Sequence, residues 1–389
     1  KKHISYFEGF NALRFIAAMF VVVHHAEQIR LTNGLEHLKE YSFFQNGGLA
    51  VDFFFVLSGF LITYLLLKEK DTDKTISIKN FYIRRILRIW PLYYLLVFLG
   101  LFLVPLILQN LGRDYALPFD FSTGLLLYVF FLPNAVSSLF PPTGNLIYVL
   151  WSIGVEEQFY LVWAPLFKYF LKYITFILVG IIIFKLLLNE LLSGMAQSDD
   201  SWIFWSKFIR TIKFETMSIG SLGAFYLFKN GPKILKDSLI FNRNFQILCF
   251  TMLFAHFCCR NYIYELNNVF SVSYSLIFKS SITQLILPTL FLWLLLNTSL
   301  NGKAIFNFRN KWMDKLGEIS YGIYMYHIIV IYIVVTFSKK WLLQQNLLFS
   351  ELLFYGLMLP VLFSCAHFSY YLFEKKILNL KPKVKNLTS

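Results

Sequence analysis

The sequence predicts an all-α, polytopic integral membrane protein with about ten transmembrane helices and one re-entrant or surface segment. Three observations support this fold class. Of the 389 residues, 57% are hydrophobic and only 15% are charged, whereas soluble domains carry about 25% charged residues. The mean hydropathy is +0.58. Apolar runs of about 17 to 25 residues, the length that crosses a bilayer as a helix, recur along the whole chain.

We interpret ten apolar runs as spans of this kind, and polar or basic segments separate them. Each is expected to form one transmembrane helix, since the bilayer interior requires every backbone hydrogen bond to be made within the segment. The runs lie near residues 10–30, 47–67, 90–110, 147–167, 173–192, 211–228, 245–258, 276–297, 318–337 and 346–373.

The first run carries charged and polar residues that are unfavourable in the lipid interior and therefore need another explanation. It contains "RFIAAMFVVVHH", in which Arg14 and His25 are eleven residues apart. Eleven helical steps rotate by about 1100° and rise about 16 Å, so the two side chains share one face, and His24 points about 80–100° away. Ala18 lies between them and leaves room for a ligand or another helix. The alternative is that Arg14 snorkels to the cytoplasmic edge and His25 only holds helices together.

The second run contains "VLSGFLI", in which Ser58 is a candidate nucleophile. A Ser-Gly pair in a membrane span is more typical of a close helix contact, and we favour that interpretation.

The third run begins with a group of arginines in "NFYIRRILRIWPLYY". Arg84, Arg85 and Arg88 lie at a helix N-terminus, where positive charge is unfavourable unless an anion binds. Guanidinium groups bind phosphate with two parallel hydrogen bonds, so a polyphosphate would suit the group. The alternative is ordinary anchoring at the cytoplasmic surface or contact with anionic lipid.

An eleventh apolar stretch, at 121–134, is shorter and ends at Pro133. The distribution of Lys and Arg decides whether it crosses, because cytoplasmic loops hold most of these residues. If it does not cross, the segments assigned to the inside hold 25 Lys or Arg and the outside segments hold eight. If it crosses, the basic segments that follow all move outside. We therefore predict a re-entrant or surface segment, a cavity beside it, and both termini in the cytoplasm.

The fourth run, "LWSIGVEEQFYLVW", places two adjacent carboxylates within its first turns. Glu156 and Tyr160 are four residues apart and share a face, so the phenol can hold the carboxylate while it faces an imidazole. The alternative is that Glu156 and Glu157 are solvated charges in the headgroup region.

The later runs hold one polar stripe, made of Ser320, Tyr324 and His327 in "EISYGIYMYHIIV", which is more typical of helix packing. His256 and His367 have no such stripe and are interpreted as structural. The four cysteines form no CxxC pair and suggest neither a disulfide framework nor a metal site. We expect a membrane domain over residues 1–377 and a basic cytoplasmic tail over 378–389.

Five motifs in order resemble the acyltransferase 3 family of bacterial membrane O-acyltransferases. They are R-x10-H in the first run, "GGLAVDFFFVLSGFLIT" in the second, "FYIRRILRIWPLYY" in the third, "WSIGVEEQFYLVW" in the fourth and "ISYGIYMYHI" near the end. The resemblance spans residues 5–375. It implies a ten-helix domain in the bacterial cytoplasmic membrane that takes an acyl group, usually acetyl from acetyl-CoA inside the cell, and passes it to a hydroxyl group of a carbohydrate or another acceptor at the outer side.

The resemblance also assigns roles to residues. It implies that His25 is the catalytic histidine, that Arg14 belongs to its motif, that Arg85 and Arg88 form the donor site, which Arg84 extends, and that Glu156 lies in the acidic motif. We expect Glu157, Tyr160, Trp151 and His327 to contact the substrate, and no metal to be needed. Some relatives continue into a soluble esterase-like (SGNH) domain. The chain printed here has none, so we expect a stand-alone membrane domain whose partner, where one is required, is a separate protein.

The chemistry agrees with these roles. A neutral imidazole with a pKa near 6.5 can remove the proton of an acceptor hydroxyl, and a carboxylate such as Glu156 can orient the imidazole. A proton-coupled transporter is the alternative, because buried His, Arg and Glu also mark transport pathways. Against it, no inverted repeat is found. The net charge of +14 is concentrated in loops assigned to the cytoplasm, where it sets topology and attracts anionic membrane lipid, so nucleic acid is not an expected partner.

Overall fold

The computed structural model describes residues 4–113, 115–232, 238–261 and 283–380, and within them the chain forms helices and loops without strands. The helices are α1 (Phe10–Thr32), α2 (Gly47–Asp73), α3 (Ile78–Phe98), α4 (Val104–Asn110), α5 (Phe121–Val129), α6 (Pro133–Leu139), α7 (Leu150–Tyr169), α8 (Ile174–Ser198), α9 (Ile203–Thr211), α10 (Phe214–Asn230), α12 (Arg243–Cys258), α15 (Thr283–Leu300), α16 (Lys311–Glu318), α17 (Ser320–Leu342), α18 (Leu347–Phe368) and α19 (Lys375–Leu378). The all-α fold predicted from the sequence is confirmed.

Two long rods consist of several helices joined end to end. A π-helical segment, Leu99–Leu103, joins α3 to α4, and another, Ser369–Glu374, joins α18 to α19. Six rods in the described part of the chain are long and apolar enough to cross a membrane, and they span Phe10–Thr32, Gly47–Asp73, Ile78–Asn110, Leu171–Ser198, Ser320–Leu342 and Leu347–Leu378. The protein is therefore a multi-pass membrane protein.

The other four predicted spans coincide with α7, α10, α12 and α15, which are shorter or carry charged side chains. The first residues of the run predicted at 276–297 lie outside the described residues, as does most of the predicted tail at 378–389.

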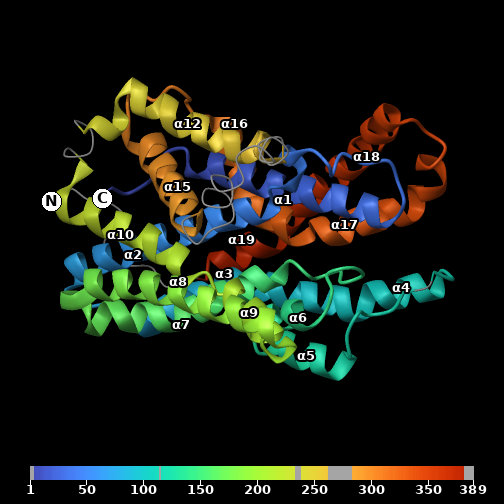
Figure 1. Ribbon diagram of the computed structural model, residues 1–389, viewed down its shortest axis with the longest axis horizontal. Coiled ribbons are helices and arrows are strands. Elements are labelled where there is room, and N and C mark those ends of the chain that lie inside the picture. The colour runs from blue at the N-terminus through green and yellow to red at the C-terminus, as the bar shows by residue number, and fades with distance from the viewer. Residues whose placement is uncertain (1–3, 114, 233–237, 262–282, 381–389) are drawn as a thin grey trace.

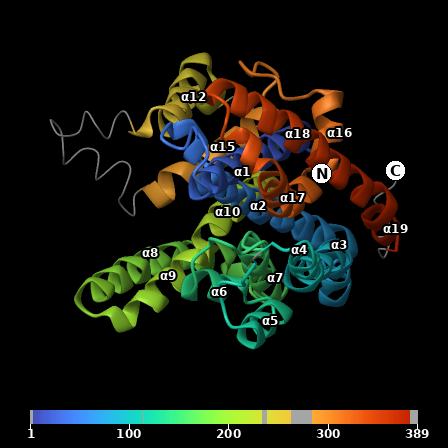
Figure 2. The same cartoon turned by 90° about the vertical axis from the view of Figure 1, so that its right-hand side faces the viewer.

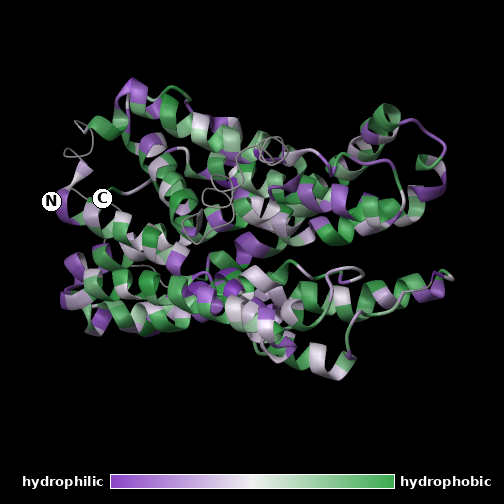
Figure 3. Ribbon diagram, in the orientation of Figure 1, coloured by the Kyte–Doolittle hydropathy of each residue, from purple (hydrophilic) through white to green (hydrophobic). Residues whose placement is uncertain are grey.

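The long helices run roughly along the horizontal axis of Figure 1. Figures 1 and 2 show α1, α12, α16, α17 and α18 on one side of the molecule, α5 to α9 on the other, and α2 and α10 between them. Hydrophobic residues predominate along the helices in Figure 3, and hydrophilic residues gather at helix ends and in the middle of the bundle. This distribution suits a protein surrounded by lipid that keeps a polar site inside.

The segment at 121–134 is broken rather than continuous. It forms α5, of nine residues, and α6, of seven, on either side of Phe131, whose φ of 56° ends the helical path. Helices of seven to nine residues rise only about 11–14 Å, well short of the roughly 30 Å hydrocarbon core. Gly154 lets α6 approach α7, because a Cβ there would lie 2.6 Å from Pro133 Cδ.

Glycines set the contact between α2 and α10 at the centre of the bundle. A Cβ on Gly59 would lie 2.0 Å from the Met217 carbonyl oxygen, and one on Gly220 would lie 2.1 Å from the Val56 carbonyl oxygen. The backbones can therefore approach as closely as small residues allow in membrane helices. The Thr63 hydroxyl donates to the Ser221 hydroxyl at 2.8 Å across the same contact.

Small and branched residues pack α1 against α17. Ala18, Val22 and Ala26 of α1 are fully buried with Ile323 and Val330 of α17. Ala18 therefore faces another helix, which is one of the two possibilities that its size left open. This packing brings His25 opposite a residue of α17.

Candidate active site

A cavity of about 210 Å³ opens among α1, α2, α3, α7 and α17. It is lined by Arg14, Val51, Phe54, Phe55, Leu57, Ser58, Leu61, Ile62, Leu65, Arg85, Arg88, Ile89, Ser152, Ile153, Glu156, Tyr160, Ser320, Tyr321 and Tyr324. Five helices far apart in sequence thus contribute side chains to one space. Of the residues predicted for the site, the cavity brings together Arg14, Arg85, Arg88, Glu156 and Tyr160.

The cavity carries an excess of positive charge. Three guanidinium groups, those of Arg14, Arg85 and Arg88, face a single carboxylate, Glu156. The Arg14 Nη1 donates to the Asn11 side chain at 3.0 Å. The Arg85 guanidinium lies 5.6 Å from the ring centres of Phe81 and Tyr160, and its buried Nε has no hydrogen-bond partner among the described residues. A buried donor without a partner is costly, so an anion in this cavity would be stabilised.

Two hydroxyl groups hold the Glu156 carboxylate. The Ser58 hydroxyl donates to Oε1 at 2.7 Å, and the Tyr160 hydroxyl donates to Oε2 at 3.0 Å. The Tyr160 bond is the one that their spacing of four residues predicts. Because each carboxylate oxygen accepts one of these hydrogen bonds, the orientation of the carboxylate is fixed.

Arg84 forms an ion pair outside the cavity. Its Nη2 forms an ion pair with Glu69 Oε2 at 2.7 Å, while Oε1 of the same carboxylate accepts the backbone N–H of Ser77 at 2.8 Å. Ser77 caps the N-terminus of α3. Arg84 therefore braces the turn between α2 and α3 and is not a lining residue of the cavity, unlike its neighbours Arg85 and Arg88.

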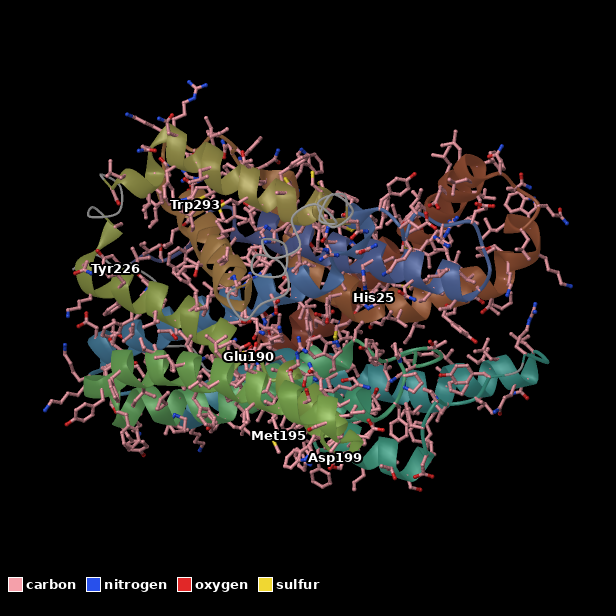
Figure 4. The ribbon with its side chains drawn as sticks, in the orientation of Figure 1. His25, Glu190, Met195, Asp199, Tyr226 and Trp293 are labelled. Carbon is pink, nitrogen blue, oxygen red and sulfur yellow. The ribbon has the colours of Figure 1, made fainter. Side chains whose placement is uncertain are left out.

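His25 pairs with another histidine rather than with Glu156. Its Nδ1 lies 3.1 Å from His327 Nε2 and 3.0 Å from the Val21 carbonyl oxygen. His327 Nδ1 lies 2.5 Å from the Tyr324 carbonyl oxygen, and His327 is fully buried. Figure 4 labels His25 on α1, in the half of the bundle that contains α18 and away from Tyr226 of α10.

These contacts determine which ring nitrogens carry hydrogen. A carbonyl oxygen only accepts, so His327 Nδ1 is the protonated nitrogen and its Nε2 presents a lone pair. The Nδ1–H of His25 then points at both His327 Nε2 and the Val21 carbonyl. Nε2 of His25 is left as the basic nitrogen, and it makes no hydrogen bond to any described residue.

Tyr324 connects the cavity to the histidine pair. Its ring lines the cavity and lies 5.8 Å from the His327 ring, and its hydroxyl is 2.6 Å from the Ser152 hydroxyl. The predicted stripe on α17 therefore faces the site: Ser320 and Tyr324 line the cavity, and His327 contacts His25.

The remaining predicted residues lie beside the cavity. Glu157 is buried and accepts a hydrogen bond from Trp90 Nε1 at 3.1 Å, while its Oε1 has no partner among the described residues. Trp151 packs edge-on against Phe55. His24 contacts Lys39 Nζ at 3.1 Å and the Phe44 carbonyl oxygen at 3.3 Å, so it faces the loop after α1 and not the cavity.

Comparison with known sequences agrees with this geometry. The profile of a family described as an acyltransferase domain matches residues 7–367, nearly the whole chain. The chain belongs to the acyltransferase 3 family. The resemblance drawn from five motifs is therefore confirmed.

Curated relatives in the acyltransferase 3 family are longer than this chain. It is 28% identical over 341 residues to the peptidoglycan O-acetyltransferase OatA of Listeria monocytogenes, a match that covers 83% of this chain and 49% of OatA. It is 31% identical over 169 residues to the putative peptidoglycan O-acetyltransferase YrhL of Bacillus subtilis, covering 43% of this chain and 24% of YrhL. It is 32% identical over 171 residues to a putative O-acetyltransferase of Staphylococcus aureus strain COL, covering 41% and 24%. The chain thus spans about half or less of each relative. No solved structure matches the chain.

Ser58 lines the cavity, although the interpretation of this acyltransferase 3 sequence favoured a helix contact for the Ser-Gly pair. Its neighbour Gly59 is the close contact to α10 that we expected from the Ser-Gly pair. One helical step separates the two side-chain directions by about 100°, so Ser58 faces the cavity and Glu156. The position of the pair within the second motif was the available signal. No cluster of three or more His, Cys, Asp or Glu residues suited to a metal ion is found in the described part of the chain.

Proposed function

We propose that this acyltransferase 3 chain is a membrane O-acyltransferase, which moves an acyl group, most simply acetyl, from acyl-CoA to a hydroxyl group of a cell-surface carbohydrate. The observation that carries the proposal is the cavity with three guanidinium groups against one carboxylate, connected through Tyr324 to the His25–His327 pair. The relatives named as O-acetyltransferases support the reaction class. The two named as acting on peptidoglycan support a glycan acceptor.

The donor is assigned to the cavity. Arg85 and Arg88 would bind the phosphate groups of CoA, since guanidinium groups match phosphate oxygens and the unpartnered Arg85 Nε would gain an acceptor. A volume of about 210 Å³ accommodates only part of CoA. The cavity would therefore hold the phosphates at its mouth and the acyl-bearing arm along α1, on the face that Arg14 and His25 share.

The acyl transfer follows from the tautomer of His25. Its Nε2 takes the proton of the acceptor hydroxyl, and the oxygen attacks the thioester carbonyl carbon. The new C–O bond forms, the C–S bond breaks, and the sulfur leaves as thiolate and accepts the proton from His25. During the step, His25 is an imidazolium whose Nδ1–H is held by His327, much as a triad's third member holds its histidine.

Glu156 acts from the cavity side in this proposal. It lies beside Arg14 and Arg85, so it balances part of their charge before CoA enters. Its two hydroxyl partners, Ser58 and Tyr160, fix the carboxylate where the acyl arm would pass. Arg14 is assigned to the same region, near the entry of the arm.

The orientation is also a proposal. The excess of Lys and Arg in residues 68–88, where α2 is followed by α3, and in residues 168–172, where α7 is followed by α8, assigns these segments and both termini to the cytoplasm. The donor then enters from inside, and the acceptor meets His25 from the outer side of the cytoplasmic membrane.

The test is release of free thiol from acetyl-CoA by purified protein, with calorimetric titration of CoA on the same samples. The wild type should release thiol when a glycan acceptor is supplied, whereas a transporter would not. The double variant Arg85→Gln and Arg88→Gln should bind CoA at least about tenfold more weakly, since each charged hydrogen bond contributes about 1.5–3 kcal/mol.

The matched control is Lys79→Gln, which removes one charge from an exposed position of the same helix outside the cavity. CoA affinity equal to that of the wild type in the double variant would contradict the donor site.

A further inference from the structure

A second pocket lies on the other face of α1. It is a groove of about 590 Å³ among α1, α2, α12 and α15, with Leu13, Phe20, Phe53, Phe250, Thr251 and Phe291 among its lining residues. Among the described residues that line it, only Thr251 and Cys258 have a polar side-chain atom. This groove is separate from the charged cavity and has almost nothing to hydrogen-bond a polar ligand. Its chemistry suits a hydrocarbon chain.

Polar and cationic side chains lie beyond the end of the groove near Phe20. The Phe20 ring packs edge-on against Phe257 and at a tilt against Phe43, with ring centres 4.9 and 5.2 Å away. One helical turn beyond Phe20, on the same face of α1, stands His24, whose Nδ1 lies 3.1 Å from Lys39 Nζ. The hydrocarbon groove therefore leads along α1 to a polar, cationic end.

A second cation approaches this end from α12. Arg260 follows the groove residue Cys258 by two positions, and its Nη2 donates to Gln45 at 3.2 Å. Burial lowers the pKa of the Lys39 ammonium to about 8, the Glu27 carboxylate opposes that shift, and the Arg260 cation adds to it. A lipid phosphate bound beside Lys39 and Arg260 would be attracted by both cations.

We infer that this groove and its cationic end form a lipid site, which takes a membrane lipid by its hydrocarbon chain and binds the lipid's phosphate group at Lys39, His24 and Arg260. The apolar groove is complementary to the hydrocarbon chain of such a lipid, and the cations at the end of the groove are complementary to its phosphate group. The inference goes beyond acyl transfer and holds whether or not the protein transfers an acyl group. A polyprenyl phosphate of a lipid-linked glycan and an ordinary anionic phospholipid share this chemistry.

The cationic end of the groove lies next to His25. His24 and His25 are adjacent, with ring centres 5.0 Å apart. A lipid phosphate at His24 would therefore hold its headgroup next to the histidine proposed as the base. The phosphate of a lipid-linked glycan bound here would bring its sugar close to the acyl-transfer site.

Native mass spectrometry of the purified full chain tests the site. Three probes are titrated: phosphatidylglycerol, the zwitterionic phosphatidylcholine and a polyprenyl monophosphate. The wild type should retain the two anionic lipids over phosphatidylcholine. Lys39→Gln removes the headgroup contact and should lower retention of both by about tenfold. Thr251→Trp fills the groove from an exposed position and should lower it similarly.

Two variants serve as matched controls. Lys340→Gln removes an exposed lysine at the end of α17, and Leu248→Trp adds the same bulk at an exposed position of α12 outside the groove. Both should retain lipid as the wild type does. Stronger retention of the polyprenyl phosphate identifies a carrier-lipid site, and equal retention identifies an anionic phospholipid site. Unchanged retention in either Lys39→Gln or Thr251→Trp would overturn the inference.

Discussion

At the scale of single residues, the proposed chemistry depends on how His25 is held. Its Nδ1 is 3.1 Å from His327 Nε2, and His327 is fixed by the Tyr324 carbonyl oxygen. Each ring therefore determines the tautomer of the next, and this leaves Nε2 of His25 as the nitrogen that serves as the base in the proposed mechanism. In the proposed mechanism His327 is a positioning residue, because it acts through its contact with His25.

The first prediction separates the three histidines. His25→Ala should abolish thiol release. His327→Ala should lower kcat about 100-fold, the lower end of what general base catalysis supplies, with little change in CoA affinity. His327→Gln should recover part of this loss, because the amide oxygen can accept the Nδ1–H of His25.

His24→Ala is the control for the pair, because His24 faces Lys39 rather than the cavity. It should keep transfer to a soluble acceptor hydroxyl near the wild-type rate. The pH dependence of kcat is the decisive reading for His327→Ala. A purely structural role would lower activity without shifting that profile, and this outcome would contradict the tautomer argument.

A second residue-level prediction concerns pH and the lipid site. The pKa of Lys39 is about 8, with Glu27, His24 and Arg260 as its charged or titratable neighbours. An anion favours the charged ammonium, so lipid retention should be high at pH 7 and fall as the pH rises through about 8 to 9. Retention measured at pH 7 and pH 9 in the wild type and in Lys39→Gln checks this. The variant should show the smaller change, and an equal decrease in both would assign the effect to another group.

At the scale of helices, the sequence predicted which faces are polar but not which partners they meet. Helical periodicity correctly placed Glu156 beside Tyr160. It could not choose between Glu156 and His327 as the partner of His25, because that choice depends on how α1 packs against α17. Arg84 and Arg85 are equivalent in the sequence pattern. Their side chains point about 100° apart around α3, so Arg84 reaches Glu69 and forms an ion pair, whereas Arg85 lines the cavity.

The contact between α2 and α10 carries the third prediction. Gly59→Ala would place a Cβ 2.0 Å from the Met217 carbonyl oxygen, so the helices must separate. Overpacking of this kind costs about 1–3 kcal/mol, and we expect a clear decrease in the thermal unfolding temperature in detergent. Gly180→Ala in α8 is the control, because no atom lies within 4 Å of its added Cβ. A decrease in both variants would show that the α2–α10 contact is not the cause.

At the scale of the whole molecule, the guanidinium groups of the cavity and His25 lie at different positions along the bundle. The guanidinium groups of the cavity lie toward the N-terminal ends of α1 and α3, and His25 lies toward the C-terminal end of α1. About 16 Å of helix separates Arg14 from His25. The two sites that the proposed reaction needs are therefore set at different depths, as a donor from one side and an acceptor from the other would require.

The last prediction tests that sidedness. Single cysteines are placed at Thr72, in the last turn of α2, and at Thr143, in the loop before α7, in a background whose four native cysteines are replaced by alanine. Both positions are exposed. Asn145, in the same loop as Thr143, is unsuitable for labelling because it is only 5% exposed and donates a hydrogen bond to Tyr128. With an impermeant maleimide on intact cells, Thr143→Cys should react and Thr72→Cys should react only after the membrane is opened. Because the proposed orientation puts the two positions on opposite sides of the membrane, labelling of Thr72→Cys alone would invert the topology. The donor phosphates would then have to bind from outside, and the direction proposed for acyl transfer would be refuted while the cavity and the histidine pair would remain.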